Sequence, residues 1–525
     1  MTIGTPVTGS RDIATPIRGP ERLASGWPVL LVLALATILR LYHLGAENYW
    51  IDEIFSLGQA GSPIAQIVSY WDPEFHTSPR PLGLVLLYAV LHLGESEWLT
   101  RLPYAILSIL DVGVIMLLSR EVVARRVWLR AGLFLALLPI HVWYAQEVRW
   151  YSQWALLTTL SYLALLKAWR TERLRWWIGF MIAAALNVYT FVVTLPVLTM
   201  QAVTAWFLPD RGSRRAFRLK AFAAMAGVGL LALPALSSAL GLLGLSSEFP
   251  ALGIGGPGSG VVSIGTPRST SLAAVPYTFF AYLAGFSIGP TVAELHALPA
   301  PLRVLREYPE VLACLVAVPL LAGSGLWALR KRPAAAALLL PWAVGVPLLV
   351  IAMSMLGGPT YNVRYTFAAV PGFALLMAVG VEAFGRWRWL GTFGVVALAG
   401  LSLANYYWAA RYDKEDVRAA VAEIRSQAGP EVPVAVIGQG LAAVQYYGAG
   451  LEVGRLRGCP SERAAPDDAG GLRFDELRAE PELWIVVSRD WGNTARGCLR
   501  GFELTHDVVA RDEYTGVEIF RLEHR

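Results

Sequence analysis

Long apolar runs separated by short polar connections fill the chain from its first tryptophan to about residue 409. The runs long enough, or nearly long enough, to cross roughly 30 Å of hydrocarbon fall at about 27–44, 101–119, 128–142, 152–169, 176–190, 191–208, 219–243, 309–329, 334–356, 365–385 and 388–409. One further run, 81–94, is too short to span, and we expect it to form a helix at the membrane interface. The pattern predicts a polytopic α-helical membrane protein with about eleven transmembrane helices.

The two ends of the chain follow other patterns. In residues 410–525, KEDVRAAVAEIRSQAG reads as an amphipathic helix, VPVAVIG and ELWIVVS as buried strands, FDELRAE as a helix and TGVEIFRL as an alternating strand. We expect a small α/β domain there. Residues 1–26 are polar and rich in Pro, Gly and Thr, and we expect a disordered tail. The first apolar run starts too late for a typical signal peptide, so we expect it to be an uncleaved span. Residues 27–409 are then expected to form one transmembrane domain.

The charges of the connections give the orientation. If 81–94 does not span, the connections SREVVARR, RTERLR, DRGSRRAFRLK, RKR and GRWR all fall on one side, and all are basic. The connections on the other side, including 45–80 and 244–308, are acidic, Gly-rich or aromatic. The positive-inside rule then predicts a cytoplasmic N-terminus and an extracytoplasmic C-terminal α/β domain. The long connection 244–308 fits either a plain linker or a lid over the outer face.

Composition excludes an ordinary soluble enzyme. Hydrophobic residues make up 55% of the chain and charged residues only 16%, whereas soluble domains carry about 25% charged residues. The 19 Trp and 20 Tyr suit aromatic belts at the membrane interfaces. Of the three cysteines, Cys314 lies inside an apolar run, while Cys459 and Cys498 lie in the C-terminal domain. There they either form a disulfide or remain two separate thiols.

An acidic pair just after the first apolar run is the first candidate for chemistry. The stretch GAENYWIDEIFS places Asp52 and Glu53 on the outer side, where Arg149 follows the end of one predicted span and Arg364 precedes another. Arginine is the side chain best matched to phosphate, so convergent arginines beside a carboxylate suggest an anionic lipid substrate. The alternative is that both arginines are interfacial residues that snorkel to water.

Five stretches occur in the order found in membrane glycosyltransferases of the C-type fold: LRLYHLGAENYWIDE, PRPLGLVLLY, ESEWLTRLP, QEVRWYS and NVRYTFAAVPG. Over essentially its whole length, the chain resembles bacterial members of glycosyltransferase family 39, relatives of the protein O-mannosyltransferases and the lipid A aminoarabinose transferase. The resemblance implies transfer of a sugar from a polyprenyl-phosphate carrier to a lipid, glycan or protein acceptor. It also implies the outer face of the bacterial cytoplasmic membrane as the place of reaction.

The resemblance also suggests roles for residues. Asp52 matches the acidic position of the family and is expected to take the acceptor's proton, while Glu53 orients the acceptor or supports Asp52. Fixed cations are expected to stabilise the departing phosphate. The residues expected at the substrate are Arg149, Arg364, Arg80, Tyr365, Glu147 and His76.

Two departures from the family pattern bear on metal binding. Many relatives have a histidine where this chain has Phe191, and the stretch HTSPRPL replaces a His-Pro-Pro-Leu pattern. No spacing typical of metal ligands remains, so arginine alone is expected to serve the phosphate, with no required metal or cofactor and no nucleic-acid partner. The competing interpretations are a secondary transporter and a non-catalytic assembly factor for envelope polysaccharide. A transporter predicts charges inside spans, where the exceptions to an apolar interior are Arg40 and Asp111.

Overall fold

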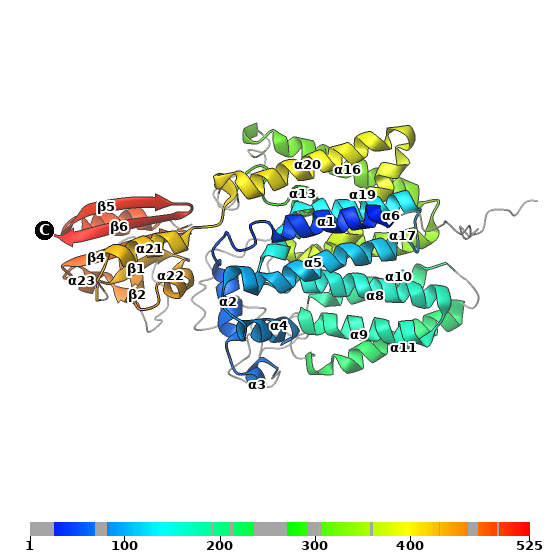
Figure 1. Cartoon of the computed structure of the whole chain (residues 1–525), viewed down its shortest axis with the longest axis horizontal. Helices are drawn as coiled ribbons and strands as arrows, with labels where there is room; N and C mark the ends of the chain where they lie inside the picture. Colours follow the sequence, from blue (N-terminus) through cyan, green and yellow to red (C-terminus); the bar gives the residue numbers. More distant parts are fainter. Residues whose placement is uncertain are drawn as a thin grey trace, which may run out of the picture.

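The computed structural model describes residues 26–68, 81–191, 193–209, 214–235, 270–291, 294, 304, 306–356, 361–429, 431–459, 471–490 and 493–525. His76, Arg80, the N-terminal tail and most of the 244–308 connection lie outside these residues. Figure 1 shows a bundle of helices running side by side, with a sheet domain at one end. The chain is a multi-helix membrane protein with a C-terminal mixed α/β region.

The elements before the sheet are α1 (Trp27–Leu41), α2 (Ile51–Ala60), α3 (Ile64–Ile67), α4 (Pro81–Leu91), α5 (Glu97–Ser119), α6 (Arg125–Leu137), α7 (Pro139–Trp143), η2 (Tyr144–Gln146), α8 (Tyr151–Thr171), α9 (Leu174–Thr190), α10 (Thr194–Phe207), α11 (Arg214–Leu231), η3 (Leu233–Ala235), α13 (Ala274–Ala284), α16 (Glu310–Leu329), α17 (Pro333–Leu339), η4 (Leu340–Gly345), α18 (Val346–Met355), η5 (Val363–Ala369), α19 (Val370–Ala383), η6 (Gly385–Trp387) and α20 (Arg388–Trp408). Each of the predicted apolar ranges contains a helix.

Fewer of these helices are long and apolar enough to cross a membrane unaided. Within the described residues there are five, or six if the bent pair α6–α7 counts as one span. The five are Glu97–Ser119, Glu310–Leu329, Pro333–Met355, Val363–Ala383 and Gly385–Trp408. The short run expected at the interface forms α4, which has 11 residues. An 11-residue helix is about 16 Å long, roughly half the thickness of a hydrocarbon core.

Two helix breaks bear on the sequence predictions. The division of 176–208 into two helices is confirmed, because α9 ends at Thr190 and Phe191 adopts an extended backbone before α10. The single span expected at 128–142 is wrong in one respect. The helix breaks at Pro139, and α6 and the following segment meet at an angle of 58°. Proline has no N–H group to continue the helical ladder, which accounts for the break.

One helix was missed within the connection 244–308. The structure places α13 at Ala274–Ala284, with Gly285 as its C-cap in a left-handed conformation (φ +63°). A Cβ atom at Gly285 would lie 2.8 Å from Pro139 Cβ, so the glycine lets α13 approach the break between α6 and α7. Its apolar run is short and interrupted by a proline, so hydropathy alone does not predict a helix there.

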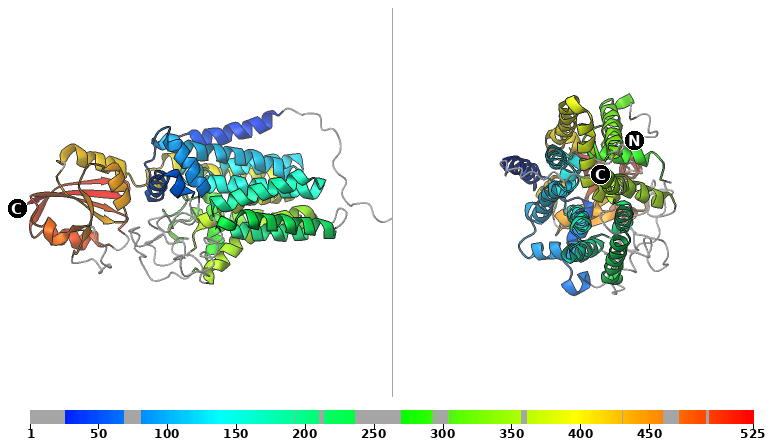
Figure 2. Two further views of the ribbon diagram at one scale, coloured as in Figure 1. Left: turned by 90° about the horizontal axis from the view of Figure 1, so that it is seen from below. Right: turned by 90° about the vertical axis from the view of Figure 1, so that its right-hand side faces the viewer.

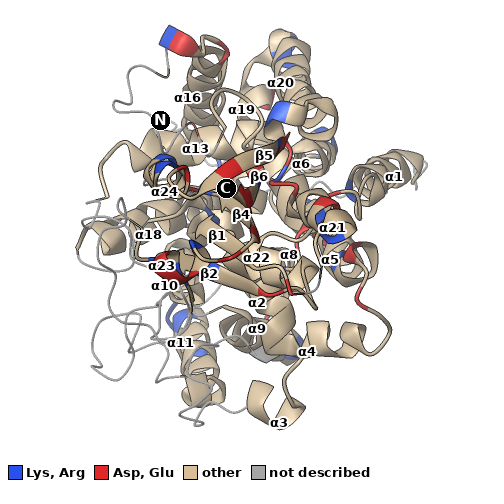
Figure 3. Cartoon of the chain, turned by 90° about the vertical axis from the view of Figure 1, so that its left-hand side faces the viewer, with Lys and Arg blue, Asp and Glu red and all other residues tan. Residues whose placement is uncertain are grey.

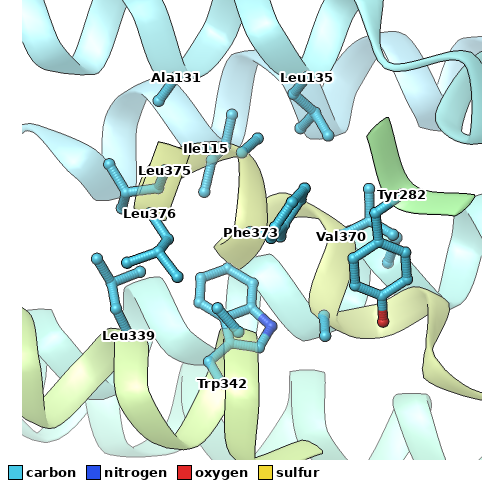
Figure 4. Close-up of a cluster of buried hydrophobic side chains, with 14 of the residues drawn as sticks. Ile115, Ala131, Leu135, Tyr282, Leu339, Trp342, Val370, Phe373, Leu375 and Leu376 are labelled. Carbon is cyan, nitrogen blue, oxygen red and sulfur yellow. The ribbon is translucent and has the colours of Figure 1, made fainter. Parts of the chain in front are cut away.

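The core of the bundle is built around α19. All of its residues from Val370 to Val381 are buried, and Figure 4 shows Phe373, Leu375 and Leu376 among side chains of neighbouring helices. Small residues bring α19 close to α16, since a Cβ at Gly325 would lie 2.7 Å from the carbonyl oxygen of Leu376. Close approach at small residues is how helices pack in lipid, where apolar burial between helices supplies little driving force.

The C-terminal region comprises η7 (Ala410–Tyr412), α21 (Val417–Gln427), β1 (Val434–Gly438), α22 (Leu441–Tyr447), β2 (Val453–Arg457), β3 (Leu472–Arg473), α23 (Phe474–Leu477), β4 (Glu482–Ser488), α24 (Ala495–Phe502), β5 (His506–Tyr514) and β6 (Val517–His524). The strand order is β3-β2-β1-β4-β6-β5. Strands β3, β2, β1 and β4 run parallel, and β6 pairs antiparallel with both β4 and β5. The predicted α/β fold of this region is confirmed.

Alternating side chains divide the sheet into two buried faces. Val434 and Val436 pack on one face with α21 and α22, whereas Ala435 and Ile437 pack on the other with α23 and α24. This is a three-layer arrangement, as Figure 2 also shows from below. A disulfide joins Cys459 to Cys498 with a Cα–Cα distance of 5.2 Å, so the first of the two cysteine alternatives is confirmed. Viewed onto this domain, acidic and basic positions are interspersed along the ribbon (Figure 3).

The sheet domain is continuous with the end of the bundle. Buried side chains of α2 and α4 form one hydrophobic cluster with those of α21, α22 and the sheet. Tyr447 of α22 reinforces the junction, because its hydroxyl oxygen accepts from the Tyr49 N–H at 2.7 Å. Arg418 of α21 donates to Glu97 at 3.0 Å and to the Ala46 carbonyl oxygen at 2.8 Å. The C-terminal domain therefore contacts the loop that precedes α2, the helix that carries the acidic pair.

Candidate active site

Glu53 is a buried anchor at the start of α2. Its side chain has no exposed surface, and its two oxygens accept from Arg101 Nε and Nη2, each at 2.9 Å. The backbone N–H groups of Val148 and Trp50 donate to the same carboxylate at 2.8 and 3.2 Å. Burial alone would raise the pKa of Glu53, but the charges of Arg101 and Lys414 outweigh it and lower that pKa to about 2. Of the two roles expected for this acid, supporting its neighbour suits these contacts better than orienting an acceptor.

Arg101 uses every N–H group of its guanidinium within the chain. Besides Glu53, its acceptors are the carbonyl oxygens of Leu44, Glu47 and Asn48, at 3.2, 2.7 and 3.1 Å. A guanidinium has five N–H groups, and all of them are engaged. Arg101 therefore fixes the loop before α2 and the position where α2 begins.

Asp52, the adjacent acid, lies in a different environment. Its side chain is 14% exposed, Arg364 Nη1 donates to its Oδ2 at 2.5 Å, and Arg149 Nη2 lies 3.8 Å from the same oxygen. Arg149 Nη1 also donates to the Asp52 carbonyl oxygen at 3.1 Å and to Ser56 Oγ at 3.0 Å. Burial alone would raise the pKa of Asp52, but the two arginine charges lower it to about 2. The carboxylate thus bridges two cations from distant parts of the chain.

The guanidinium groups of Arg149 and Arg364 keep N–H groups to spare. Among the described residues, Nε of each is buried without a hydrogen-bond partner, and the Arg364 guanidinium donates only to Asp52. Each group lies beside an aromatic ring: Arg149 Cζ is 3.9 Å from the Trp150 centroid and Arg364 Cζ is 5.6 Å from that of Tyr365. Two oriented guanidinium groups with unused N–H groups can bind an anion that has several oxygens.

Glu147 lies beside this pair but is more deeply buried. Trp143 Nε1 donates to its Oε1 at 2.6 Å, and Lys414 Nζ lies 3.8 Å from the same oxygen. Its Oε2 is buried without a partner among the described residues. Burial raises the pKa of Glu147 to about 7 although Lys414 opposes the shift, and the negative charge of Glu53 adds to it.

The segment that leads into the C-terminal domain supplies charges to the same site. Lys414 Nζ lies 3.7 Å from Glu53 Oε2, so it stands between Glu53 and Glu147. The next residue, Glu415, accepts two hydrogen bonds from Arg489 at 2.6 and 2.7 Å. The Arg489 guanidinium lies 5.5 Å from the ring centroid of Trp50, the residue before α2.

The structure brings together most of the residues expected at the site. The residues gathered around Asp52 are Glu53, Arg149, Arg364, Glu147 and Tyr365. His76 and Arg80 lie outside the described residues. Sequence reasoning missed Arg101, Lys414 and Arg489. Arg101 lies in ESEWLTRLP, one of the five matching stretches, and this position was the available signal; the other two lie in a region read only as a domain.

Phe191, which replaces the histidine of many relatives, is a packing residue in this structure. It is 1% exposed, and its ring lies 5.1 Å from Trp154 and 6.1 Å from Tyr365, centroid to centroid. Among the described residues, no group of three or more His, Cys, Asp or Glu side chains is placed to hold a metal ion. That the enzyme needs no metal stays a prediction.

Comparisons with known proteins address the family and the fold. Residues 77–240 match the model of a family described as dolichyl-phosphate-mannose-protein mannosyltransferase. The predicted resemblance to glycosyltransferase family 39 is confirmed. The family 39 match includes Arg101, Glu147 and Arg149, and leaves Asp52 and Arg364 outside it.

Solved structures share the fold over nearly the whole chain. ArnT from Cupriavidus metallidurans in the apo state is similar at a TM-score of 0.55 and 14% identity, covering 94% of this chain and 98% of ArnT. The same protein bound to undecaprenyl phosphate gives a TM-score of 0.52 at 14% identity, covering 95% and 98%. The search of curated proteins found no match. The similarity in fold to ArnT therefore extends beyond residues 77–240.

Proposed function

We propose that this protein is a glycosyltransferase that moves a sugar from a polyprenyl-phosphate donor to a lipid, glycan or protein acceptor. The observation that carries the proposal is the pair of partly unsatisfied arginines, Arg149 and Arg364, that share the Asp52 carboxylate. The family 39 match and the ArnT-like fold support the same class of reaction. In the ArnT structure bound to undecaprenyl phosphate, that related protein holds a lipid of the proposed kind.

Asp52 and the donor phosphate compete for the same cations in this proposal. Without substrate, Asp52 is bound by Arg364 at 2.5 Å and is a weak base, with a pKa of about 2. A phosphate with several anionic oxygens binds the two guanidinium groups more completely than one carboxylate oxygen does. When the phosphate binds the two arginines, it neutralises the positive charge that lowers the pKa of Asp52. The pKa of Asp52 then rises, and its carboxylate becomes a better proton acceptor.

The transfer step then balances. The acceptor hydroxyl oxygen forms a bond to the anomeric carbon while its proton passes to Asp52. The bond between the anomeric carbon and the phosphate oxygen breaks, and that oxygen leaves with the electron pair as polyprenyl phosphate. Arg149 and Arg364 stabilise the negative charge that gathers on the leaving oxygen, which is where fixed cations lower a barrier most. The order of events places sugar-donor binding before activation of the acceptor.

The other site residues take supporting roles. Glu53 positions α2 through Arg101, and Tyr365 lines the phosphate site beside Arg364. The raised pKa of Glu147, about 7, suits a group that holds or releases a proton near neutral pH. His76 and Arg80 remain candidates for contacts with the acceptor and the phosphate.

The orientation in the membrane rests on charge. Ion pairs join the basic connections at one end of the bundle: Arg170 with Glu121 at 2.5 Å, Lys220 with Glu172 at 3.1 Å, and Arg126 with Glu382 at 2.6 Å. We place this end in the cytoplasm by the positive-inside rule. With eleven spans, the candidate active site and residues 410–525 then lie on the outer face of a bacterial cytoplasmic membrane.

Transfer from a defined donor tests the proposal. Purified protein in lipid nanodiscs is incubated with radiolabelled polyprenyl-phosphate sugars and membrane acceptors, and release of polyprenyl phosphate is measured. We expect release by the wild type, and at least a hundred-fold less by Asp52→Asn, the usual scale for loss of a general base. Equal release by both proteins would exclude Asp52 as the base. No release with any donor, in a protein whose fold is intact, would favour a non-catalytic assembly factor.

A further inference from the structure

A second polar cluster lies inside the bundle, beneath the site. Arg40 of α1, Ser108 and Asp111 of α5, and His141 of α7 all have no exposed surface. Ionisable groups at such depth are rare because charge is costly in a membrane, and they usually have a functional reason. The proposed reaction uses none of these residues.

Arg40 donates hydrogen bonds at the helix break that precedes Pro139. Its five N–H groups have five separate acceptors: Ser108 Oγ at 2.8 Å, the carbonyl oxygens of Ala36 at 3.2 Å, Ala136 at 2.9 Å and Leu135 at 3.2 Å, and His141 Nδ1 at 2.7 Å. In a continuous helix, the Leu135 carbonyl oxygen would accept from the residue four positions later, which is Pro139 and has no N–H. Arg40 supplies the missing donor, so it caps the end of α6.

The hydrogen bonds also fix the state of His141. Arginine can only donate, so Nδ1 of His141 is the acceptor, and its proton lies on Nε2. That nitrogen lies 3.2 Å from Asp111 Oδ2 and donates to it. His141 is therefore neutral, and Arg40 and Asp111 balance each other's charge through its ring. The cluster carries no net charge, which a buried site requires.

Both phosphate-binding arginines depend on elements that this cluster holds. The segment after the break runs through α7 and η2 directly into the loop that carries Arg149. On the other side, the His141 ring stacks on Phe367 with 5.6 Å between centroids. Phe367 lies three residues after Arg364, in the same short helix η5. The His141 ring therefore links α7, which leads to the loop with Arg149, to η5, which carries Arg364.

We propose that Arg40, His141 and Asp111 are positioning residues that set the spacing between Arg149 and Arg364, and hence the affinity for the donor phosphate. The inference rests on the proposed phosphate-binding role of the two arginines. One further observation supports a tuned arrangement: Asp111 Oδ1 is buried without a partner among the described residues. A cluster that served stability alone would gain by satisfying or removing that oxygen.

The test measures binding of polyprenyl phosphate, without sugar, to protein in nanodiscs. His141→Phe keeps a ring against Phe367 but removes both nitrogens, so α7 loses its link to Arg40 and Asp111. We expect the Kd to rise about ten- to a hundred-fold, because displacements near 1 Å at a binding group have effects of that size. Arg40→Lys keeps the charge but loses the planar guanidinium group, so we expect it to raise the Kd as well.

Gln201→Leu is the matched control. Gln201 is equally buried in the bundle, and it donates to Ser161 at 2.6 Å, away from the site. Its loss should lower thermal stability and leave the Kd unchanged. If His141→Phe behaves like this control while Arg149→Lys raises the Kd, the positioning role is refuted and the proposed function stands. If Arg149→Lys also leaves the Kd unchanged, the phosphate site itself is wrong.

Asp111→Asn keeps the test decisive if His141→Phe does not fold. The amide oxygen still accepts from His141 Nε2, but the charge that balances Arg40 is lost. We expect a smaller rise in the Kd for polyprenyl phosphate, several-fold. A Kd equal to that of the wild type in a folded Asp111→Asn protein would overturn the proposal.

Discussion

The clearest prediction concerns the two adjacent acids, for which we propose different roles. Asp52 and Glu53 look alike in the sequence, yet Glu53 is buried with four hydrogen bonds and Asp52 is 14% exposed between two arginines. We predict that Glu53→Gln destabilises the fold, and that Asp52→Asn lowers turnover at least a hundred-fold while the fold remains. The two substitutions are matched, since each replaces one carboxylate oxygen by an amide nitrogen.

The magnitudes follow from the contacts. In Glu53→Gln, an amide N–H₂ group faces an N–H of Arg101, and the buried guanidinium loses its counter-charge. Breaking a buried ion pair by removal of one partner costs about 3–5 kcal/mol of unfolding free energy. Asn at position 52 keeps an oxygen that accepts from Arg364, so we expect a loss of only about 1 kcal/mol there. Turnover by Asp52→Asn should fall at least a hundred-fold.

Thermal unfolding in detergent and turnover are measured on the same preparations. Glu97→Gln serves as the control, because Glu97 forms a more exposed ion pair with Arg418 at 3.0 Å, and such pairs contribute about 1 kcal/mol or less. Stability of Glu53→Gln equal to that of the control would refute the anchor role. Unfolding of Asp52→Asn, with normal stability of Glu53→Gln, would reverse the assignment of the two acids.

Three further outcomes follow from other features. The pKa of Glu147 is raised from 4.5 to about 7, so the folded state binds this proton more tightly than the unfolded state does. The unfolding free energy should therefore fall by about 3 kcal/mol as pH rises from 4.5 to 7. Thermal melts across this pH range should lose that slope in Glu147→Gln. Reduction of the Cys459–Cys498 disulfide, with a sequence separation of 39, should lower the stability of the C-terminal domain by about 3–4 kcal/mol, and thiol labelling of the denatured protein should require a reductant. Reporter fusions at Lys331 should show a cytoplasmic location, and fusions at the C-terminus should show an extracytoplasmic one. A cytoplasmic C-terminus would contradict the eleven-span topology.

Hydropathy predicted the helices well because lipid forces long apolar runs to be helical. It did not separate the two acids. Successive residues on a helix point about 100° apart, so Glu53 faces the bundle while Asp52 faces the arginines, and which acid faces which way depends on where α2 begins. That start is fixed by Arg101, which lies 48 residues away in the sequence. No local pattern encodes such a partner.

The break at Pro139 and the position of Lys414 likewise depend on contacts that no local sequence pattern encodes. Proline inside an apolar run was visible, but the run alone does not tell whether the helix bends or ends. Arg40 donates to the Leu135 carbonyl oxygen, which Pro139 leaves without its helical partner, and hydropathy does not reveal this contact. Lys414 lies in a hydrophilic segment like many others, and only the fold brings it within 3.7 Å of Glu53.

The shared hydrophobic cluster of α2, α4, α21 and α22 has a consequence for how the enzyme is made. Helix α2, which carries the acidic pair, leaves the ribosome early, whereas α21, α22 and Lys414, which lies 3.7 Å from Glu53, are synthesised late. Until the final part of the chain has been exported, α2 lacks its packing partners in the C-terminal domain. In the proposed topology, a partly inserted chain would therefore be unable to consume the lipid-linked sugar, and activity would begin only with completed translocation.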